Sequence, residues 1–358
     1  MISRKILFLL DSLGGGGFER RMTQLIMGLS EDKDYAEVYV LLPQNARVIR
    51  KEALHYDCQY IYYDGRADIL RKLSVVKPDI IHCCSPVNSF IVNIYRASHN
   101  CKYVAGFVAD ANRPPFFSKK NFGFEMAYLF SDAIVGNSKA GLDAYRCPPN
   151  KAHVIYNGFD PRRLDIEMPG DLKEIRENNP FVISMVAAFR DDKDYYAYID
   201  VASSLRSNSD ILFLTAGLGP NENAIKEYSK QKQCSNVVFL GYRMDVINVF
   251  KISDISLLLS NQSRHKEGVS NSIMESMAVG TPVIATSGGG TNEIIRNGLD
   301  GFILENNNVD TVVKNINKLY ENKELRHSMS QECAKRVKED FSLETMISRY
   351  KELYNKIS

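Results

Sequence analysis

Two glutamates, Glu267 and Glu275, lie eight residues apart in the segment that offers the clearest chemistry. Ser270 or Asn271 is a good N-cap for a short helix, and Gly280 is suited to end it. The first N–H groups of such a helix have no partner within it and can bind an anion or a hydroxyl group. Carboxylates are strong acceptors for the hydroxyl groups of a sugar. The segment therefore predicts a sugar-binding pocket, and the alternative is an ordinary helix with two surface glutamates.

Two further segments contain groups that could bind phosphate. Four consecutive glycines, 14–17, follow a predicted first strand, and their N–H groups could approach a diphosphate at the start of a helix. Arg190 and Lys193 follow the first strand of a second series, where cations could stabilise the charge on a leaving group. The alternatives are a flexible glycine turn and a solvated charged turn.

The glycine segment does not fit a dinucleotide cofactor. A dinucleotide-binding loop needs a further glycine two or three positions on, and an acidic residue near the end of the second strand. Here Phe18, Glu19 and Arg20 follow the glycines, and the second predicted strand leads into Pro43. An enzyme that uses NAD is therefore disfavoured.

The elements that must position these residues follow from an alternation of short apolar runs with stretches of helical composition. Runs rich in Val, Ile or Phe predict buried strands in two series, at 6–10, 38–42, 80–84, 103–108 and 133–135, and then at 181–187, 211–215, 237–240, 255–259, 282–285 and 301–304. Such alternation is typical of parallel sheets with helices on both faces. The last stretch, 310–358, has no strand pattern and predicts helices.

The two series predict an α/β protein with two doubly wound domains that face each other. A polar break with several prolines and charges, 160–180, separates the series and is expected to be the linker region. The first domain should therefore span residues 1–160 and the second should begin at 161. Ligands of such folds bind at the carboxyl ends of the strands, which places the expected site in the cleft between the domains.

Composition excludes several classes of function. The 358 residues carry a formal net charge of +2, which gives no general attraction to nucleic acid. Seven scattered cysteines without a CxxC pattern indicate reduced thiols of a cytoplasmic protein, not disulfides or a zinc site. The N-terminal apolar run stops at Asp11, and no stretch approaches the ~18 apolar residues of a membrane span. Any contact with a membrane should be peripheral.

The segment from Glu267 to Pro282 resembles the signature of the family 4, or group 1, retaining glycosyltransferases, whose GT-B architecture has two Rossmann-like domains across a cleft. The resemblance implies that Glu267 and the amides after it hold the donor sugar, and that Glu275 holds the nucleotide ribose. In this architecture the second domain would end near 339, and a C-terminal helix at about 340–358 would join the first domain. The donor-binding residues that the resemblance implies are Gly16, Gly17, Arg190, Lys193, Tyr242, Gly268, Val269, Ser270, Asn271 and Glu275.

The acceptor side departs from the family pattern. Many members have a His after the fourth or fifth strand of the first domain, whereas this sequence offers Asp110 as a polar candidate there. Glu267, Asp110 and Lys193 are therefore the expected catalytic residues. No metal or other cofactor is expected, because the two Asp-Lys-Asp runs, 32–34 and 192–194, place a Lys between the acids, which lowers their affinity for cations.

The resemblance implies transfer of a hexosyl or N-acetylhexosaminyl group, with retention, from a nucleotide-diphosphate sugar to a hydroxyl of a glycan or lipid-linked acceptor. UDP is the favoured carrier, and bacterial surface polysaccharide synthesis is the expected setting. Two alternatives stay open. One is a catalytically silent, sugar-nucleotide-binding partner of an active glycosyltransferase. The other is a sugar-nucleotide epimerase of the same architecture, against which the segment from Glu267 to Glu275 argues.

A segment of the first domain, 113–124, mixes cations with aromatic residues. Such a mixture could engage anionic lipid headgroups or a lipid-diphosphate acceptor at the inner face of the membrane. The alternative is a loop whose Phe side chains pack into the first domain.

Overall fold

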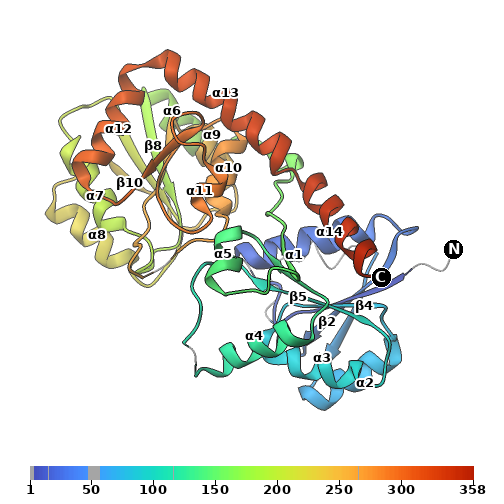
Figure 1. The fold of residues 1–358 in the computed structure, drawn as a ribbon. Helices are drawn as coiled ribbons and strands as arrows, with labels where there is room; N and C mark the ends of the chain where they lie inside the picture. Colours follow the sequence, from blue (N-terminus) through green and yellow to red (C-terminus); the bar gives the residue numbers. More distant parts are fainter. Residues whose placement is uncertain (1–3, 15, 47–56, 116, 265) are drawn as a thin grey trace. The chain divides into compact units, whose positions relative to one another are not determined.

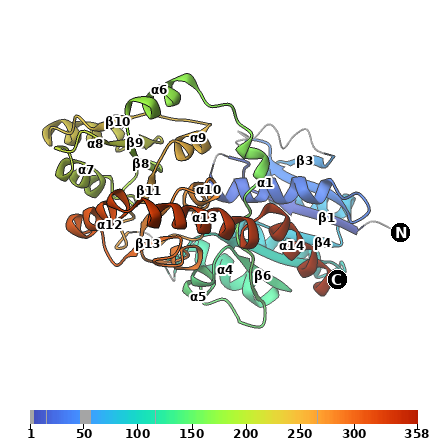
Figure 2. The ribbon, with the colours of Figure 1, turned by 90° about the horizontal axis from the view of Figure 1, so that it is seen from above.

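The computed structural model describes residues 4–14, 16–46, 57–115, 117–264 and 266–358. The chain divides into two compact units. Unit 1 comprises residues 1–158 together with 343–358, and unit 2 comprises residues 159–342 (Figure 1). Each unit is one parallel sheet with helices on its two faces, as the sequence predicts (Figure 2).

Unit 1 contains a seven-stranded sheet in the order β3-β2-β1-β4-β5-β6-β7. Its strands are β1 (Arg4–Leu9), β2 (Ala36–Pro43), β3 (Gln59–Tyr63), β4 (Ile80–Cys83), β5 (Lys102–Val108), β6 (Ala133–Gly136) and β7 (Ala152–Val154). The sequence predicted the five central strands and missed β3 and β7. These two lie at the sheet edges and are partly exposed, so they lack the continuous apolar run of a buried strand.

Both faces of the unit 1 sheet are buried. Alternate residues of β1 point to opposite faces: Leu7 belongs to one core, and Phe8 belongs to the other. The covering helices are α1 (Gly17–Ser30), α2 (Gly65–Val76), η2 (Pro86–Asn88), α3 (Ser89–Arg96), α4 (Lys119–Phe130), α5 (Lys139–Ala144) and α14 (Leu343–Ile357). The C-terminal helix α14 packs into the core on the α1 side through Tyr350 and Tyr354.

Unit 2 contains a six-stranded sheet in the order β10-β9-β8-β11-β12-β13. Its strands are β8 (Phe181–Val186), β9 (Ile211–Ala216), β10 (Val237–Phe239), β11 (Ile255–Leu258), β12 (Val283–Thr286) and β13 (Gly301–Leu304). All six were predicted. Its helices are η3 (Pro161–Leu164), α6 (Gly170–Asn178), α7 (Tyr195–Ser204), α8 (Glu222–Gln231), α9 (Val246–Lys251), α10 (Asn271–Ala278), α11 (Thr291–Ile294), α12 (Val309–Glu321) and α13 (Lys323–Asp340).

The expectation of a linker at 160–180 is wrong for most of that stretch. Residues 161–164 form η3 and residues 170–178 form α6, and both belong to unit 2. Leu172 anchors α6, because its side chain is buried in a core with Val182 and Leu214. One well-placed leucine in a charged helix is a weaker signal than the prolines around it, which is why the sequence suggested a break.

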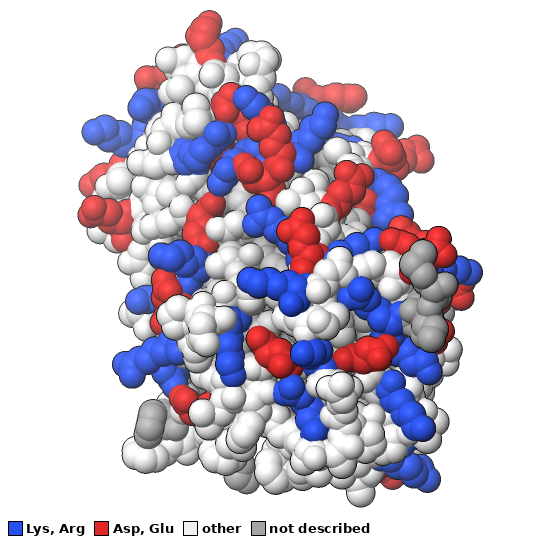
Figure 3. All heavy atoms as spheres, turned by 45° about the vertical axis from the view of Figure 1, so that its right-hand side comes forward, with Lys and Arg blue, Asp and Glu red and all other residues white. Residues whose placement is uncertain are grey.

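Charged side chains do not form a single-sign surface on the face drawn in Figure 3. Lys and Arg are interspersed there with Asp and Glu. This distribution agrees with the near-zero net charge of the chain. It gives no reason to expect a polyanion such as nucleic acid as the partner of that face.

Candidate functional site

The topology of unit 2 brings two loops together. The strand order reverses between β8 and β11, so the loops that follow these strands lie next to each other at the carboxyl end of the sheet. Lys193 in the first loop forms an isolated antiparallel bridge with Ser260 in the second. The backbone N–H of Asp194 also donates to the carbonyl of Leu259, at 2.8 Å.

An ion pair between Lys193 and Glu267 lies at this junction. Only 10% of the Lys193 side chain and 14% of the Glu267 side chain are exposed. The Ser260 hydroxyl donates to Glu267 Oε1 at 3.1 Å. Two of the predicted catalytic residues, far apart in sequence, are therefore in contact.

Burial controls the protonation of Lys193. Desolvation lowers the pKa of its ammonium to about 8, against the opposing charge of Asp192, whose carboxylate lies 3.5 Å away. An anion brought next to this ammonium would raise its pKa again, because an opposite charge favours the charged form.

A set of polar side chains that the sequence reasoning missed holds the junction in place. Asn307 donates to Asp194 Oδ2 at 2.9 Å and to the carbonyl of Ser260 at 3.0 Å. The Thr286 hydroxyl donates to Asn307 Oδ1 and accepts from the N–H of Ser260. Thr286 ends β12 and Asn307 follows β13. Their place at the carboxyl ends of predicted strands was the signal that could have identified them.

The second glycine segment, 288–290, packs against the backbone of Glu267 and its neighbours. Gly289 has a φ of +56°, and a Cβ there would overlap the carbonyl oxygen of Glu267. A Cβ at Gly290 would lie 2.6 Å from the carbonyl carbon of Gly268. The N–H of Gly290 donates to the Glu267 carbonyl at 2.8 Å. These glycines permit a backbone approach that fixes the position of Glu267.

Helix α10 starts directly beside this loop. Ser270 is its N-cap residue, with extended backbone, and Asn271 is its first residue. The Ser272 hydroxyl donates to the carbonyl of Val186 at 2.7 Å, which ties the start of the helix to the end of β8. Gly280 follows the helix with a φ of +79°, as expected for a glycine stop. The predicted short helix is confirmed.

Glu275 is buried on α10 and has a partner that the sequence did not reveal. Arg163 Nη1 donates to Glu275 Oε1 at 2.8 Å. The Arg163 guanidinium also lies over the Phe159 ring, 5.6 Å from its centroid. Arg163 belongs to η3, more than a hundred residues earlier, inside the stretch expected to be a linker. No spacing pattern could have linked the two residues.

Family models cover both units of the chain. The model for glycosyl transferases group 1 matches residues 171–336, and the model for glycosyltransferase family 4 matches residues 15–163. The first match contains Lys193, Glu267 and Glu275, and together the two matches span most of the chain. The chain belongs to the group 1 and family 4 glycosyltransferases.

Several individual glycosyltransferases are similar to this chain. A UDP-Gal:alpha-D-GlcNAc-diphosphoundecaprenol alpha-1,3-galactosyltransferase of Escherichia coli is 29% identical over 216 residues, which cover 58% of this chain and 54% of that protein. The match thus spans about half the length of that relative. An uncharacterized glycosyltransferase of Methanocaldococcus jannaschii is 22% identical over 96% of this chain and 95% of its own length. The crystal structure of Anabaena HepE with UDP and glucose has a TM-score of 0.83 and 19% identity, over 98% of this chain and 99% of that chain. This last likeness shows the shared GT-B fold.

Two other residues that were expected to bind the donor, Arg190 and Tyr242, lie near the same end of the unit 2 sheet. Arg190 donates through Nε and Nη2 to the two carboxylate oxygens of Asp192, at 2.8 and 2.9 Å, and its side chain is half exposed. Tyr242 follows β10 and is exposed, next to Gly241 at a φ of +67°. Arg190 is therefore paired with Asp192 and half exposed, whereas the Lys193 side chain is almost completely buried.

The remaining predicted site residues belong to unit 1. Gly17 is the first residue of α1 and Gly16 is its N-cap. A Cβ at Gly16 would overlap the carboxylate of Glu19. The space beside this turn is therefore occupied by the Glu19 side chain. Asp110 accepts hydrogen bonds from the Tyr145 hydroxyl at 2.9 Å and from the N–H of Asn112 at 2.8 Å. These two hydrogen bonds fix the position of the Asp110 carboxylate in the loop after β5.

The Asp-Lys-Asp run at 192–194 is occupied by protein contacts. Asp192 pairs with Arg190, and Asp194 caps α7 through the N–H of Ala197 at 3.0 Å. The Asp32 carboxylate of the other run pairs with Lys351 at 2.6 Å. Among the described residues, no three His, Cys, Asp or Glu side chains gather in a way that could hold a metal ion.

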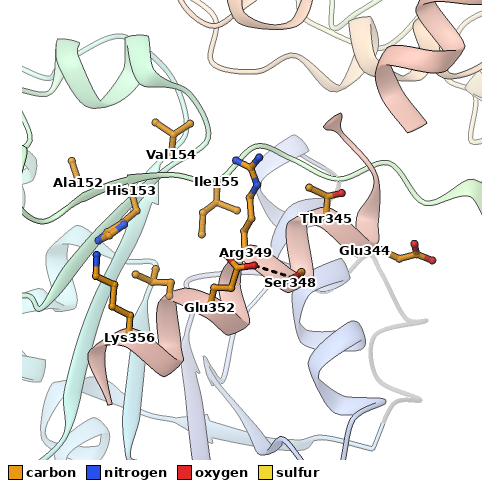
Figure 4. A pocket seen from close by; sticks show the side chains of 11 residues that line it. Ala152, His153, Val154, Ile155, Glu344, Thr345, Ser348, Arg349, Glu352 and Lys356 are labelled. Atoms are coloured by element: carbon orange, nitrogen blue, oxygen red, sulfur yellow. Dashed lines mark hydrogen bonds between the residues drawn. The ribbon is translucent and has the colours of Figure 1, made fainter. Parts of the chain in front are cut away.

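A groove of about 840 Å³ in unit 1 is lined by none of the predicted site residues. It lies between β7 and α14 (Figure 4), with His153 and Lys356 at one end and Arg349 and Glu352 further along. Burial and the charge of Lys356 lower the pKa of His153. Cations and carboxylates alternate along this groove, so its chemistry favours no single class of ligand.

Proposed function

We propose that this glycosyltransferase moves a hexosyl or N-acetylhexosaminyl group from a UDP-sugar to a hydroxyl of a glycan or lipid-linked acceptor, with retention of configuration and without a metal ion. The observation that carries the proposal is the contact of Lys193 with Glu267 beside the start of α10. A buried cation, a carboxylate and a helix N-terminus together match the diphosphate and the sugar hydroxyls of such a donor.

Each of these groups has a role in the proposed reaction. The bond between the sugar C1 and the β-phosphate oxygen breaks, and the acceptor oxygen forms a new bond to C1 on the same face. The leaving phosphate oxygen takes the acceptor proton. Lys193 stabilises the negative charge that develops on this phosphate, while Glu267 and the amides of 268–271 hold the sugar. Glu275, fixed by Arg163, accepts hydrogen bonds from the ribose hydroxyls.

The substrates of similar glycosyltransferases support the choice of donor and acceptor. The Escherichia coli relative acts on UDP-Gal and a diphosphoundecaprenol acceptor, and Anabaena HepE is seen with UDP and glucose. Another relative, from Staphylococcus aureus, is named for capsular polysaccharide biosynthesis. We propose the same setting here, bacterial surface polysaccharide synthesis at the inner face of the membrane.

The first experiment is calorimetric titration of the protein with UDP, GDP, CDP and ADP. Binding of UDP alone would support the donor class, and tighter binding of another nucleotide would overturn it. Turnover of the matching nucleotide-sugar with a diphosphoundecaprenol-linked sugar, in the presence and absence of EDTA, then tests transfer and metal independence. The anomeric configuration of the product, measured by NMR, tests retention. Binding without turnover on any acceptor would favour the silent-partner alternative.

The first prediction concerns pH. Because the pKa of Lys193 is lowered to about 8, its ammonium is present below pH 8 and is lost as the pH rises above it. Affinity for UDP should therefore fall by up to about tenfold per pH unit above pH 8. Calorimetry between pH 7 and 9.5 measures this slope. Lys193→Arg, which stays charged, should remove the slope, and equal affinity of the wild type across the range would contradict the prediction.

A second prediction concerns Glu275. Replacement by Ala removes the carboxylate that is proposed to hold the ribose, and it should weaken UDP binding by ~1–3 kcal/mol, or about 5- to 150-fold. Glu227→Ala is the matched control, since this glutamate of α8 is mostly exposed. Calorimetry of both variants decides the matter. Unchanged affinity in a folded Glu275→Ala protein would refute the ribose role.

A further inference from the structure

A small cavity of about 150 Å³ lies beside α7 and α8 in unit 2. The buried residues Tyr195 and Ile225 line it and belong to the core under these two helices. Further lining residues come from the loops that follow β8, β9 and β11. The polar side chains among them include Arg190, Asp191, Lys193, Asn221, Asn261 and Arg264.

The cavity and the carboxylate proposed to hold the ribose belong to opposite sides of the unit 2 sheet. Helices α7 and α8 pack against each other, and their buried residues share one core with Phe213. Helix α10, which carries Glu275, packs against α9, whose Val249 lies in a second core with Leu214. Phe213 and Leu214 are neighbours on β9, so they point to opposite faces of the sheet. The cavity is therefore separate from the ribose side of the proposed donor site.

A network of polar side chains surrounds Asp191 at the cavity. Arg264 Nη1 donates to Asp191 Oδ2 at 2.8 Å, and Asn221 Nδ2 donates to Asp191 Oδ1 at 2.6 Å. These three residues follow three different strands, so the network ties three loops together. A carboxylate has about four acceptor sites, and a guanidinium has more N–H donors than one bond uses. The network can therefore donate to a ligand and accept from it as well.

The charged side chains that line the cavity have partners within the protein. Arg190 pairs with Asp192, and Lys193 pairs with Glu267. Asp194 caps α7. An ion that entered would have to break one of these contacts or stay unpaired, whereas a neutral ligand with hydroxyl groups gains hydrogen bonds without that cost. The balance of charge therefore favours a neutral polar ligand.

An exposed aromatic ring also lines the cavity. Tyr196, near the start of α7, is 47% exposed. Its ring lies 4.9 Å from the ring of Tyr228 on α8, at an interplanar angle of 72°. This contact limits the orientations of the Tyr196 ring. A ring held in this way offers an apolar face to the C–H groups of a sugar, while the polar groups beside it meet the hydroxyls.

We infer that this cavity binds one neutral sugar unit of a glycan, at a site separate from the donor site. Cavities of about this volume accept a single six-membered ring. The sugar unit would belong to the acceptor or product glycan, and in this respect the inference rests on the proposed function. A second contact of that kind raises the effective concentration of the glycan at the enzyme.

Saturation-transfer NMR tests the inference without a transfer reaction. Wild-type protein is mixed with glucose, galactose, mannose or N-acetylglucosamine, each with and without saturating UDP. At least one of the four sugars should give a signal that UDP does not remove. Tyr196→Ser should weaken that binding by about tenfold, and Asp191→Asn by at least about fivefold. The matched control is Tyr62→Ser in unit 1, a tyrosine of similar exposure, which should bind as the wild type does.

The readout is independent of the proposed reaction, since a protein that fails to bind UDP can still show a sugar signal that Tyr196→Ser removes. Four results would overturn the inference: no signal from any of the four sugars, equal signals in the wild type and the Tyr196→Ser protein, loss of the signal when UDP is added, or displacement of the sugar by inorganic phosphate. The third would assign the sugar to the donor site, and the fourth would make the cavity an anion site. Circular dichroism melting shows whether the variants are folded, and small shifts are expected because the Tyr196 and Asp191 side chains are largely exposed.

Discussion

Lys193→Ala should lower the rate of sugar transfer by about 100- to 1,000-fold, the loss typical when a group that stabilises developing negative charge is removed. The Lys193 ammonium is nearly buried, so water cannot replace it easily, and its charge acts at short range in a medium of low polarity. Removal of the cation also leaves the Glu267 carboxylate without its ion-pair partner, which should repel a diphosphate. Both effects act in the same direction. Steady-state kinetics with the nucleotide-sugar, together with calorimetry for UDP, measure them.

Variants of two other cations test whether the burial of Lys193 determines the size of its effect on the transfer rate. Arg190→Ala should have a smaller effect, about three- to tenfold, because this side chain is half exposed and already pairs with Asp192. Lys230→Ala on α8 should leave the rate as it is, since that side chain is mostly exposed and distant in the chain. A Lys193→Ala protein that folds and turns over within threefold of the wild type would remove Lys193 from the mechanism.

The sequence predicted the residues of the site better than it predicted what holds them. Glu267, Lys193 and the start of α10 could be found because each follows an apolar run that reads as a buried strand. The carboxyl ends of parallel strands meet at one edge, so three local patterns were enough to place them together. The contact between Lys193 and Glu267 then follows from the reversal of strand order between β8 and β11.

Arg163 and Asn307 show what the sequence could not provide. Arg163 reaches Glu275 from a short 3-10 helix in a stretch rich in proline and charge, where no periodicity predicts a direction for the side chain. Asn307 acts through two hydrogen bonds to residues more than forty positions away. Such contacts depend on tertiary packing. The hydrogen bond that Asp110 accepts from the Tyr145 hydroxyl is a further contact of this kind.

Gly289→Ala should destabilise unit 2 by about 2–5 kcal/mol, since two unfavourable effects coincide at this position. A side chain disfavours the left-handed backbone at a φ of +56°, and the added Cβ would overlap the carbonyl oxygen of Glu267. The Glu267 backbone would have to move, together with the carboxylate that pairs with Lys193. The variant should therefore also lose UDP binding at temperatures where it is still folded. Thermal unfolding and calorimetry measure the two losses separately.

Gly298→Ala separates the backbone effect from the overlap. Gly298 also has a positive φ, +83°, but a Cβ there would meet no atom within 4 Å. It should cost only the backbone strain, about 1–2 kcal/mol, and leave UDP binding unchanged. The Gly289→Ala protein should then melt several degrees below the Gly298→Ala protein, because 1 kcal/mol shifts the Tm of a domain of this size by about 2–4 °C. Equal melting and equal UDP affinity of the two variants would mean that the glycine segment does not position Glu267, and the site would have to be held by the contacts of Ser260 and Asn307 alone.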